Sequence, residues 1–328
     1  MKCIGKYSKL ISVLLLTVVM ATGCGITDLL GTKNVVAEYE AENYNKDLYT
    51  GKLFASDLCV ASGDISLSGI SSDETNTLHS AALFDVDRKK VDFSYQMFDK
   101  IYPASTTKIM TALLALENSN LDDQVTFTEE CLADQTSDSG NIGMQVGEVL
   151  TMRQCLLALM IRSANDVATQ IAVQIAGSVS AFADMMNQEA LAMGASRSHF
   201  VNPNGLPDEN HYTSVYDLYL IFQNAVQDQT FLDIISTMSY DVVYTDVNGA
   251  GVEKTWENTN QYLTGKEKAP EGITVVGGKT GTTGAAGYCL VLYSYNASGQ
   301  PIVSIVLKAD GKSNLYLLMN EMLSGFAN

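Results

Sequence analysis

Residues 274–307 read TVVGGKTGTTGAAGYCLVLYSYNASGQPIVSIVL, and this stretch decides the class of fold. It contains three runs rich in Val, Ile, Leu and Tyr, at Thr274–Gly278, Ala286–Tyr295 and Ile302–Leu307, which turn-forming residues separate. Short runs of β-branched and aromatic residues between turn formers are typical of strands. The stretch therefore predicts consecutive β-strands, and the amphipathic segment Ser313–Leu323 predicts a helix after them.

The residues before this stretch predict a hairpin and then a helical lobe. Ser80–Val86 and Lys90–Met97 are strand-like and are joined by the turn-forming Asp87-Arg88-Lys89. This order predicts an α/β (α+β) fold, in which an antiparallel sheet is flanked by helices and a helical sub-domain is inserted in sequence. Apolar residues at helical spacing predict the helices at Ala104–Glu117, Thr151–Ile161, Asp166–Ile175, Ala181–Met193 and Thr213–Val226.

The first 55 residues read as export and tethering segments. Three lysines precede the short apolar run Leu10–Met20, as in a signal peptide over residues 1–23. The run ends in Ala21-Thr22-Gly23-Cys24, which resembles a bacterial lipobox. Cys24 is therefore the expected lipidation site, and a lipid anchor would hold the chain at the outer face of the bacterial cytoplasmic membrane; an ordinary cleaved signal is the alternative. The polar, non-periodic residues 24–55 predict a linker, which leaves 56–328 as one domain.

Composition excludes two classes of function. Acidic residues outnumber basic residues by 37 to 20, and the net charge of −17 argues against nucleic acid as a partner. The cysteines form no C-x-x-C pair and do not cluster with histidine, so no metal site is expected. Cys155 and Cys289 lie in apolar runs and predict buried thiols. A disulfide between Cys59 and Cys131 stays open as an alternative.

The first chemical motif is Ser105-Thr106-Thr107-Lys108, at the start of a predicted helix. Residues three apart share one helix face, so the hydroxyl of Ser105 and the amine of Lys108 are expected to meet. A serine hydroxyl needs a base, and a lysine can act as one if burial or a nearby cation lowers its pKa. Alone, a Ser-x-x-Lys is a weak signal, because both residues are common.

Two further motifs follow it in the sequence. Ser163-Ala164-Asn165 follows a predicted helix and would present a hydroxyl and an amide in a loop; a simple N-cap is the alternative. Gly278-Lys279-Thr280-Gly281 lies on a predicted strand, where Lys279 and Thr280 can bind a carboxylate and the glycines admit a substrate backbone. A phosphate-binding loop would need Gly at position 273 and a following helix, and the chain has Ile273 and a strand instead.

The three motifs, in this order, resemble those of the penicillin-binding protein and serine β-lactamase superfamily. Ser163 follows Ser105 by 58 residues and Lys279 follows Ser163 by 116. The flanking text YPASTTKIMTA at 102–112, NPNGL at 202–206 and KTGTTGAAGY at 279–288 is similar to the D-alanyl-D-alanine carboxypeptidases of peptidase family S11. The resemblance covers roughly Leu78 to Leu323 and implies a β-lactamase/transpeptidase-like catalytic domain within 56–328.

The resemblance implies a role for each motif residue and no cofactor. Ser105 would attack the carbonyl between the two D-alanines of a peptidoglycan stem peptide, Lys108 would accept its proton, and Ser163 would relay a proton to the leaving amine. The oxyanion would lie between the N–H groups of Ser105 and Thr282. The remaining members would bind substrate: Asn165 its amide, Lys279 and Thr280 its terminal carboxylate, and Gly281 its backbone.

Three other functions stay open on the same motifs. An endopeptidase that cuts cross-links between stem peptides has the same residues. A class A β-lactamase would need a deacylating glutamate about 35 residues after Asn165, where the chain reads SHFVN at 198–202. Without it, β-lactam antibiotics are expected to inhibit covalently. A non-catalytic wall-binding lipoprotein would be expected to lack Ser105 or Lys108. Arg162 and Asp166 flank the second motif and could support its loop, with surface charge at helix ends as the alternative, and neither is included in the site. His79, His199 and His211 read as surface or packing residues.

Overall fold

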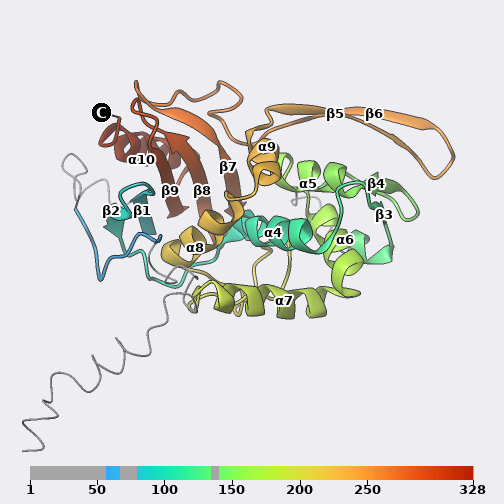
Figure 1. Ribbon diagram of the computed structural model, residues 1–328. Helices are drawn as coiled ribbons and strands as arrows, with labels where there is room; N and C mark the ends of the chain where they lie inside the picture. The colour runs from blue at the N-terminus through green and yellow to red at the C-terminus, as the bar shows by residue number, and fades with distance from the viewer. Residues whose placement is uncertain (1–56, 67–79, 134–139, 328) are drawn as a thin grey trace, which may run out of the picture. The chain divides into compact units, whose positions relative to one another are not determined.

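The computed structural model describes residues 57–66, 80–133 and 140–327 (Figure 1). Leu58–Asn328 forms one compact unit. The expected signal peptide, the expected linker, Cys24 and His79 lie outside the described residues and stay predictions.

An antiparallel sheet of five strands organises this unit. Its order is β2-β1-β9-β8-β7, so the N-terminal hairpin and the three C-terminal strands share one sheet. The predicted hairpin and the three predicted strands are confirmed, although β7 is longer than expected at its C-terminal end. The strands are β1 (Ser80–Asp85), β2 (Lys90–Tyr95), β7 (Thr274–Thr283), β8 (Gly287–Tyr295) and β9 (Pro301–Ala309).

Helices cover both faces of this sheet (Figure 1). Alternate residues of a strand point to opposite faces, and in β8 both sets are apolar. Leu290 and Leu292 pack with α10 (Lys312–Ser324), whereas Val291 and Tyr293 belong to the larger core with the helices of the other face. The continuous apolar run of β8 is thus the mark of a strand buried on both sides. The predicted fold class, an antiparallel sheet flanked by helices, is confirmed.

The helical lobe is built around α4 (Lys108–Asn118), which is buried from Lys108 to Ala115. A helix buried all round sits in the middle of a lobe rather than on its surface. Four predicted helices are confirmed to within two residues, and α5 begins with a capping box between Thr151 and Gln154. They are α5 (Met152–Ile161), α6 (Asn165–Ala176), α7 (Val179–Ala192) and α8 (Val215–Ala225).

Several elements were not expected from the sequence. The predicted helix at 104–117 begins as a 3₁₀ turn, η1 (Ala104–Thr107), before α4. No separate helix was predicted at α9 (Gln229–Ser236), and no strands were predicted at β5 (Ser239–Thr245) and β6 (Gly251–Glu257), which pair as a hairpin. Small elements complete the lobe: β3 (Gln124–Thr126), η2 (Glu129–Leu132) and β4 (Val149–Thr151).

The structure also bears on the possible disulfide and on the possibility of a membrane-spanning helix. Cys59 and Cys131 are both free and buried, so the alternative of a disulfide between them is wrong; the Cys59 thiol instead donates to the Asp85 carbonyl at 3.2 Å. Cys155 and Cys289 are buried thiols, as predicted. In the described part of the chain, no helix is long and apolar enough to cross a bilayer.

Candidate active site

Ser105 and Lys108 lie at the junction of η1 and α4. Side chains three residues apart eclipse each other in a 3₁₀ turn, which brings Lys108 Nζ to 2.9 Å from Ser105 Oγ. The residue before the serine, Ala104, has a φ of +49°, in the left-handed region that non-glycine residues seldom adopt. Strained backbone of this kind persists where the surroundings fix it, and it concentrates at functional sites.

Three acceptors surround the amine of Lys108. Besides Ser105 Oγ, they are Asn165 Oδ1 at 2.6 Å and the Asn204 carbonyl at 2.7 Å. Lys108 is fully buried. Its amine is therefore held in one place, directed at the serine hydroxyl, and in its neutral form it has a lone pair for the proton of Ser105.

Ser163 stands in the short loop between α5 and α6, as predicted. Its φ of +61° is also left-handed, and its hydroxyl accepts a hydrogen bond of 2.9 Å from Lys279 Nζ. The alternative of a simple N-cap is wrong, because the N-cap position of α6 is Ala164. The loop therefore aims the Ser163 hydroxyl at β7 instead of at a helix end.

Strand β7 supplies Lys279, Thr280 and Gly281. Lys279 is fully buried and its amine also donates to the Thr280 carbonyl at 2.6 Å. Burial lowers the pKa of Lys279 to about 7, because an ammonium is poorly solvated there. The Thr280 hydroxyl is 2.6 Å from that of Thr259. The strand continues to Thr283, which agrees with the exclusion of a phosphate-binding loop.

Gly281 is required by its neighbours. A Cβ built there would lie 3.0 Å from the backbone nitrogen of Ser105 and 3.1 Å from the Cβ of Ala104. Contacts this short are rare, so a side chain at residue 281 would push the strand and the nucleophile turn apart by a few tenths of an ångström.

Two cavities open on either side of Ser105. One, of about 340 Å³, is lined by Lys312, Arg162, Ser163, Thr280 and Thr282, among others. The other, of about 270 Å³, is lined by Asn165, Asn204 and residues 205–207 together with Thr282–Gly284. All eight predicted site residues are thus brought to one cleft: Ser105, Lys108, Ser163, Asn165, Lys279, Thr280, Gly281 and Thr282.

Several residues of this cleft had no predicted role in the site, although NPNGL at 202–206 was part of the family resemblance. Asn204 contacts Lys108 through its backbone carbonyl, which no side-chain pattern reveals. Gly205 has a φ of +87°, and a Cβ there would lie 1.8 Å from the Ala104 carbonyl, so the NPNGL loop packs directly on the nucleophile turn. Arg162, which flanks the second motif but was left out of the predicted site, lines the cleft, and Lys312 reaches it only through the tertiary structure.

Of the two interpretations of Asp166, the surface charge at a helix end is wrong, and the structure agrees with support of the loop at the second motif. Asp166 is fully buried, and its carboxylate accepts the backbone N–H groups of Ile142, Gly143 and Met144 at 3.0–3.3 Å. Desolvation raises its pKa, while these hydrogen bonds act in the opposite direction. Asp166 therefore ties the segment that begins at Gly140 to the start of α6, beside Ser163.

His211 is a packing residue, as expected, but it packs under the nucleophile turn. Its Nδ1 accepts the N–H of Val201 at 3.1 Å, so the hydrogen of a neutral ring is on Nε2, which donates to Thr107 Oγ1 at 2.8 Å. Burial lowers the pKa of His211 to about 4 and keeps the ring neutral. Among the described residues, no group of three or more His, Cys, Asp or Glu side chains could hold a metal ion.

Comparison with known proteins decides the family. The family model described as D-alanyl-D-alanine carboxypeptidase, Peptidase S11, matches residues 70–311. The chain belongs to the S11 family. The matched region contains all eight residues that the sequence predicted for the site and ends one residue before Lys312.

Named S11 relatives include both carboxypeptidases and endopeptidases. The chain is 32% identical over 218 residues to D-alanyl-D-alanine carboxypeptidase DacF of Bacillus subtilis, covering 64% of this chain and 52% of that protein. It is 29% identical over 236 residues to a D-alanyl-D-alanine endopeptidase of Pseudomonas aeruginosa, covering 71% and 72%. The chain thus spans about half the length of DacF.

A solved structure has the same fold as this chain. The Streptomyces K15 DD-transpeptidase superposes with a TM-score of 0.69 at 26% sequence identity, covering 82% of this chain and all of that one. The resemblance to the S11 family and to its fold, stated from the motifs, is confirmed.

Proposed function

We propose that this chain is a serine-type D-alanyl-D-alanine carboxypeptidase that removes the terminal D-alanine of peptidoglycan stem peptides. The observation that supports it most directly is the 2.9 Å contact between Lys108 Nζ and Ser105 Oγ, at the mouth of a cleft in a chain of the S11 family. A non-catalytic binding protein has no need of a buried amine held against a serine hydroxyl.

The proposed first step forms the acyl-enzyme. Ser105 Oγ attacks the carbonyl carbon between the two D-alanines while its proton passes to Lys108. The N–H groups of Ser105 and Thr282 stabilise the oxyanion of the tetrahedral intermediate. The C–N bond then breaks, and the leaving amine takes a proton through Ser163. Water later hydrolyses the ester on Ser105 and releases the shortened peptide.

The two cavities fit the two sides of the cleaved bond. The leaving D-alanine bears a carboxylate, and the larger cavity has Lys312 and Arg162 in its wall, near Lys279. The other cavity has the amide of Asn165 and the loop of Asn204–Pro207, which suits the backbone amides next to the D-alanyl residue on the acyl side. We therefore assign the Ser163 side to the leaving group and the Asn165 side to the rest of the stem peptide.

Slow deacylation of β-lactam antibiotics is part of the proposal. Neither cavity beside Ser105 is lined by an Asp or Glu among the described residues. A β-lactamase of class A type deacylates with such a carboxylate. Penicillins are therefore proposed to remain bound to Ser105 as covalent inhibitors, which argues against the β-lactamase alternative.

The place of action is proposed from the N-terminal sequence. Lys2, Lys6 and Lys9, the apolar run Leu10–Met20 and Cys24 support export followed by lipidation. The lipid would hold the domain at the outer face of the cytoplasmic membrane, where stem peptides are exposed. Radiolabelled palmitate incorporated into the wild-type protein and lost in Cys24→Ser would support this anchor; no incorporation would exclude it.

Release of D-alanine from diacyl-L-Lys-D-Ala-D-Ala tests the activity. The wild-type protein is expected to release it and the Ser105→Ala variant is not. In a second measurement, labelled penicillin is expected to leave a stable adduct on Ser105, detected by mass spectrometry of the tryptic peptide. Rapid turnover of the drug, or no D-alanine release from a protein that folds, would overturn the proposal.

A further inference from the structure

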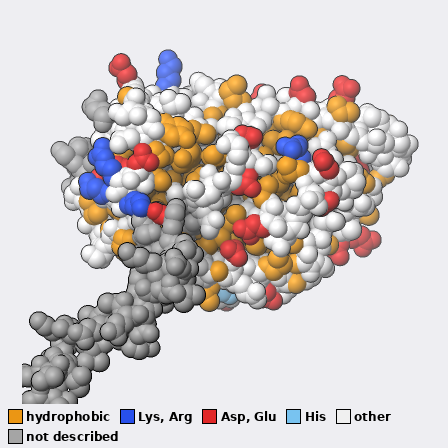
Figure 2. All heavy atoms as spheres, in the orientation of Figure 1, with side chains coloured by type: hydrophobic (Ala, Val, Ile, Leu, Met, Phe, Trp, Pro, Cys, Tyr) orange, Lys and Arg blue, Asp and Glu red, His pale blue; other side chains and the backbone are white. Residues whose placement is uncertain are grey.

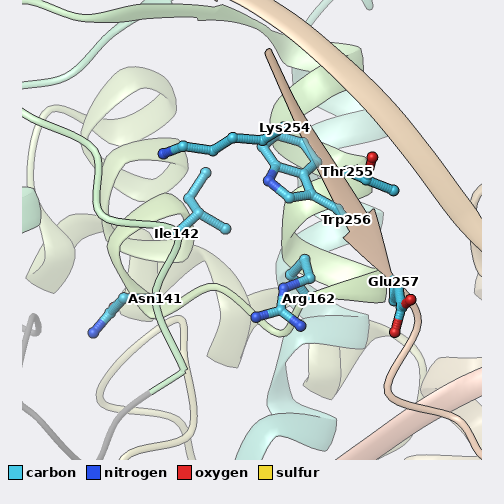
Figure 3. Close-up of a pocket in the computed structure, with 7 residues that line it drawn as sticks. All are labelled: Asn141, Ile142, Arg162, Lys254, Thr255, Trp256 and Glu257. Carbon is cyan, nitrogen blue, oxygen red and sulfur yellow. The ribbon is translucent and has the colours of Figure 1, made fainter. Parts of the chain in front are cut away.

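A third cavity, of about 540 Å³, adjoins the leaving-group side of the cleft (Figure 3). Arg162 lines both this cavity and the one beside Ser105, and Asn141 follows Gly140, which also lines the latter. The third cavity is therefore reached from Ser105 past Ser163, on the side to which the leaving amine departs. Its lining residues come from three places: the 141–142 segment, the end of α5, and strand β6.

The walls of this cavity combine cations with an apolar surface. Arg162 and Lys254 are exposed, and no carboxylate forms an ion pair with either of them among the described residues. Lys254 donates to the hydroxyl of Tyr244 at 3.2 Å. Ile142 and the edge of the Trp256 ring, which is 3% exposed, form the apolar part. Glu257 is the only acidic residue in the lining.

Cations are scarce in this protein, which makes their position informative. The chain has 20 basic against 37 acidic residues. On the face shown in Figure 2, acidic side chains are spread widely and basic ones gather mostly near β1 and β2, where Arg88, Lys89 and Lys90 are exposed. Two cations that pair with no carboxylate of the described residues favour an anionic ligand beside the cleft.

A single leaving D-alanine cannot account for this cavity. Under the proposed function its carboxylate binds in the cavity that Ser163, Thr280 and Lys312 line, on the near side of Arg162. The third cavity lies beyond Arg162, so only a leaving group much larger than alanine reaches it. In cross-linked peptidoglycan, the leaving amine belongs to the side chain of a second stem peptide, which carries free carboxylates.

We propose that the cavity formed by Asn141, Ile142, Arg162, Lys254 and Trp256 binds the second, amine-bearing stem peptide of a cross-link. The proposal rests on the proposed function, because it uses the same acyl transfer. The amide between the D-alanyl carbonyl and the side-chain amine breaks, the acyl group stays on Ser105, and the amine takes its proton through Ser163. Arg162 and Lys254 face carboxylates of the second stem, and Trp256 and Ile142 face its alkyl segments.

Two substrates separate this site from the cleft itself. A cross-linked muropeptide dimer reaches the third cavity, whereas diacyl-L-Lys-D-Ala-D-Ala does not. Lys254→Glu is expected to lower kcat/KM for the dimer about tenfold through charge reversal, while D-alanine release stays within about twofold of wild type. Lys89→Glu, with the same charge change in the β1–β2 turn at the other edge of the sheet, is the matched control and is expected to alter neither.

The outcomes distinguish failure of the site from failure of the proposed function. If the wild-type protein releases D-alanine but does not cleave the dimer, or if Lys254→Glu cleaves the dimer as fast as wild type, the second-stem site is wrong and the carboxypeptidase stands. If the wild-type protein neither releases D-alanine nor forms a penicillin adduct, the proposed function itself is wrong.

The cavity also contains its own reporter. Trp256 is the only tryptophan of the chain, so intrinsic fluorescence reports on this cavity without catalysis. Titration of Ser105→Ala with an isolated tetrapeptide stem is expected to give a saturable change, weakened about tenfold by adding Lys254→Glu and unchanged by adding Lys89→Glu. A signal that does not saturate, or that Lys254→Glu leaves intact, would count against the site.

Discussion

Lys108 Nζ lies 2.9 Å from Ser105 Oγ and 2.6 Å from Asn165 Oδ1, so one buried amine joins the first motif of the sequence to the second. Lys279 in turn joins the second motif to the third through its 2.9 Å hydrogen bond to Ser163. The two lysines therefore form a line of contacts from the proposed nucleophile to the proposed carboxylate site.

Replacing Lys108 by Met removes the proposed base and keeps most of the side-chain volume. The rate of acylation by penicillin and the release of D-alanine are each expected to fall by about 10²–10⁴-fold. Thermal unfolding shows whether the variant still folds. A folded Lys108→Met protein that acylates at the wild-type rate would show that another group takes the proton of Ser105.

Replacing Gly281 by Ala tests how closely β7 must approach the nucleophile. The new Cβ would lie 3.0 Å from the Ser105 nitrogen, and a shift of a few tenths of an ångström there is expected to slow acylation roughly tenfold. Gly251→Ala, at the start of β6, is the control, because it lines neither cavity beside Ser105 and a Cβ at that position meets nothing within 4 Å. Equal rates for the two variants would mean that the contact at 281 has no effect on the chemistry.

The sequence was sufficient for the sheet, the main helices and the motif residues because these depend on local patterns. The apolar residues in the runs of β8 and β9, and those at helical spacing in α5 to α8, are the residues that the fold buries. Their order in the sequence is therefore enough to predict these strands and helices. The same patterns place the three motifs on a helix, a loop and a strand, and the tertiary fold brings them together.

The parts that escaped prediction depend on contacts between distant residues. The Asn204 carbonyl meets Lys108 through backbone geometry, and Asp166 becomes buried only because the 142–144 segment folds over it. In β5, Val242 and Tyr244 are buried and alternate with exposed residues, but Val243 between them is apolar too, so the sequence does not show the period of two.

Replacing Asp166 by Ala is expected to lower the free energy of unfolding by about 1–3 kcal/mol, because backbone N–H groups of residues 142–144 lose their acceptor. Urea denaturation measures the change. Asp184→Ala, at an exposed position of α7, is the matched control and is expected to stay within about 0.5 kcal/mol of wild type. If the two variants were equally stable, the buried carboxylate would not hold the segment.

His211 is expected to make the fold sensitive to mild acid. Its pKa is lowered to about 4 in the folded chain from an ordinary value of 6.5, chiefly by burial, so the unfolded chain binds the extra proton between these values. Stability is therefore lost as the pH falls from about 6.5 to 4, by roughly 3 kcal/mol for this group. The urea midpoint should depend less on pH over this range in His211→Gln than in the wild type, whereas His199→Gln should keep the wild-type dependence. The same pH dependence in both variants would exclude His211 as the cause.

Lys279 is expected to limit activity on the alkaline side. Its pKa of about 7 means that the free enzyme loses the ammonium as the pH rises through neutrality, and a neutral amine attracts a substrate carboxylate far less than a cation does. The value of kcat/KM for D-alanine release should therefore fall above about pH 7, because this ratio reports groups of the free enzyme.

A bound carboxylate favours the charged amine of Lys279, so the corresponding fall in kcat should occur at higher pH. Since Lys279 touches Ser163 and not Ser105, the difference between the two profiles should disappear for a substrate whose terminal carboxylate is replaced by an amide. A kcat/KM that stays level to about pH 9 with the free carboxylate would show that the charge of Lys279 is not used in binding.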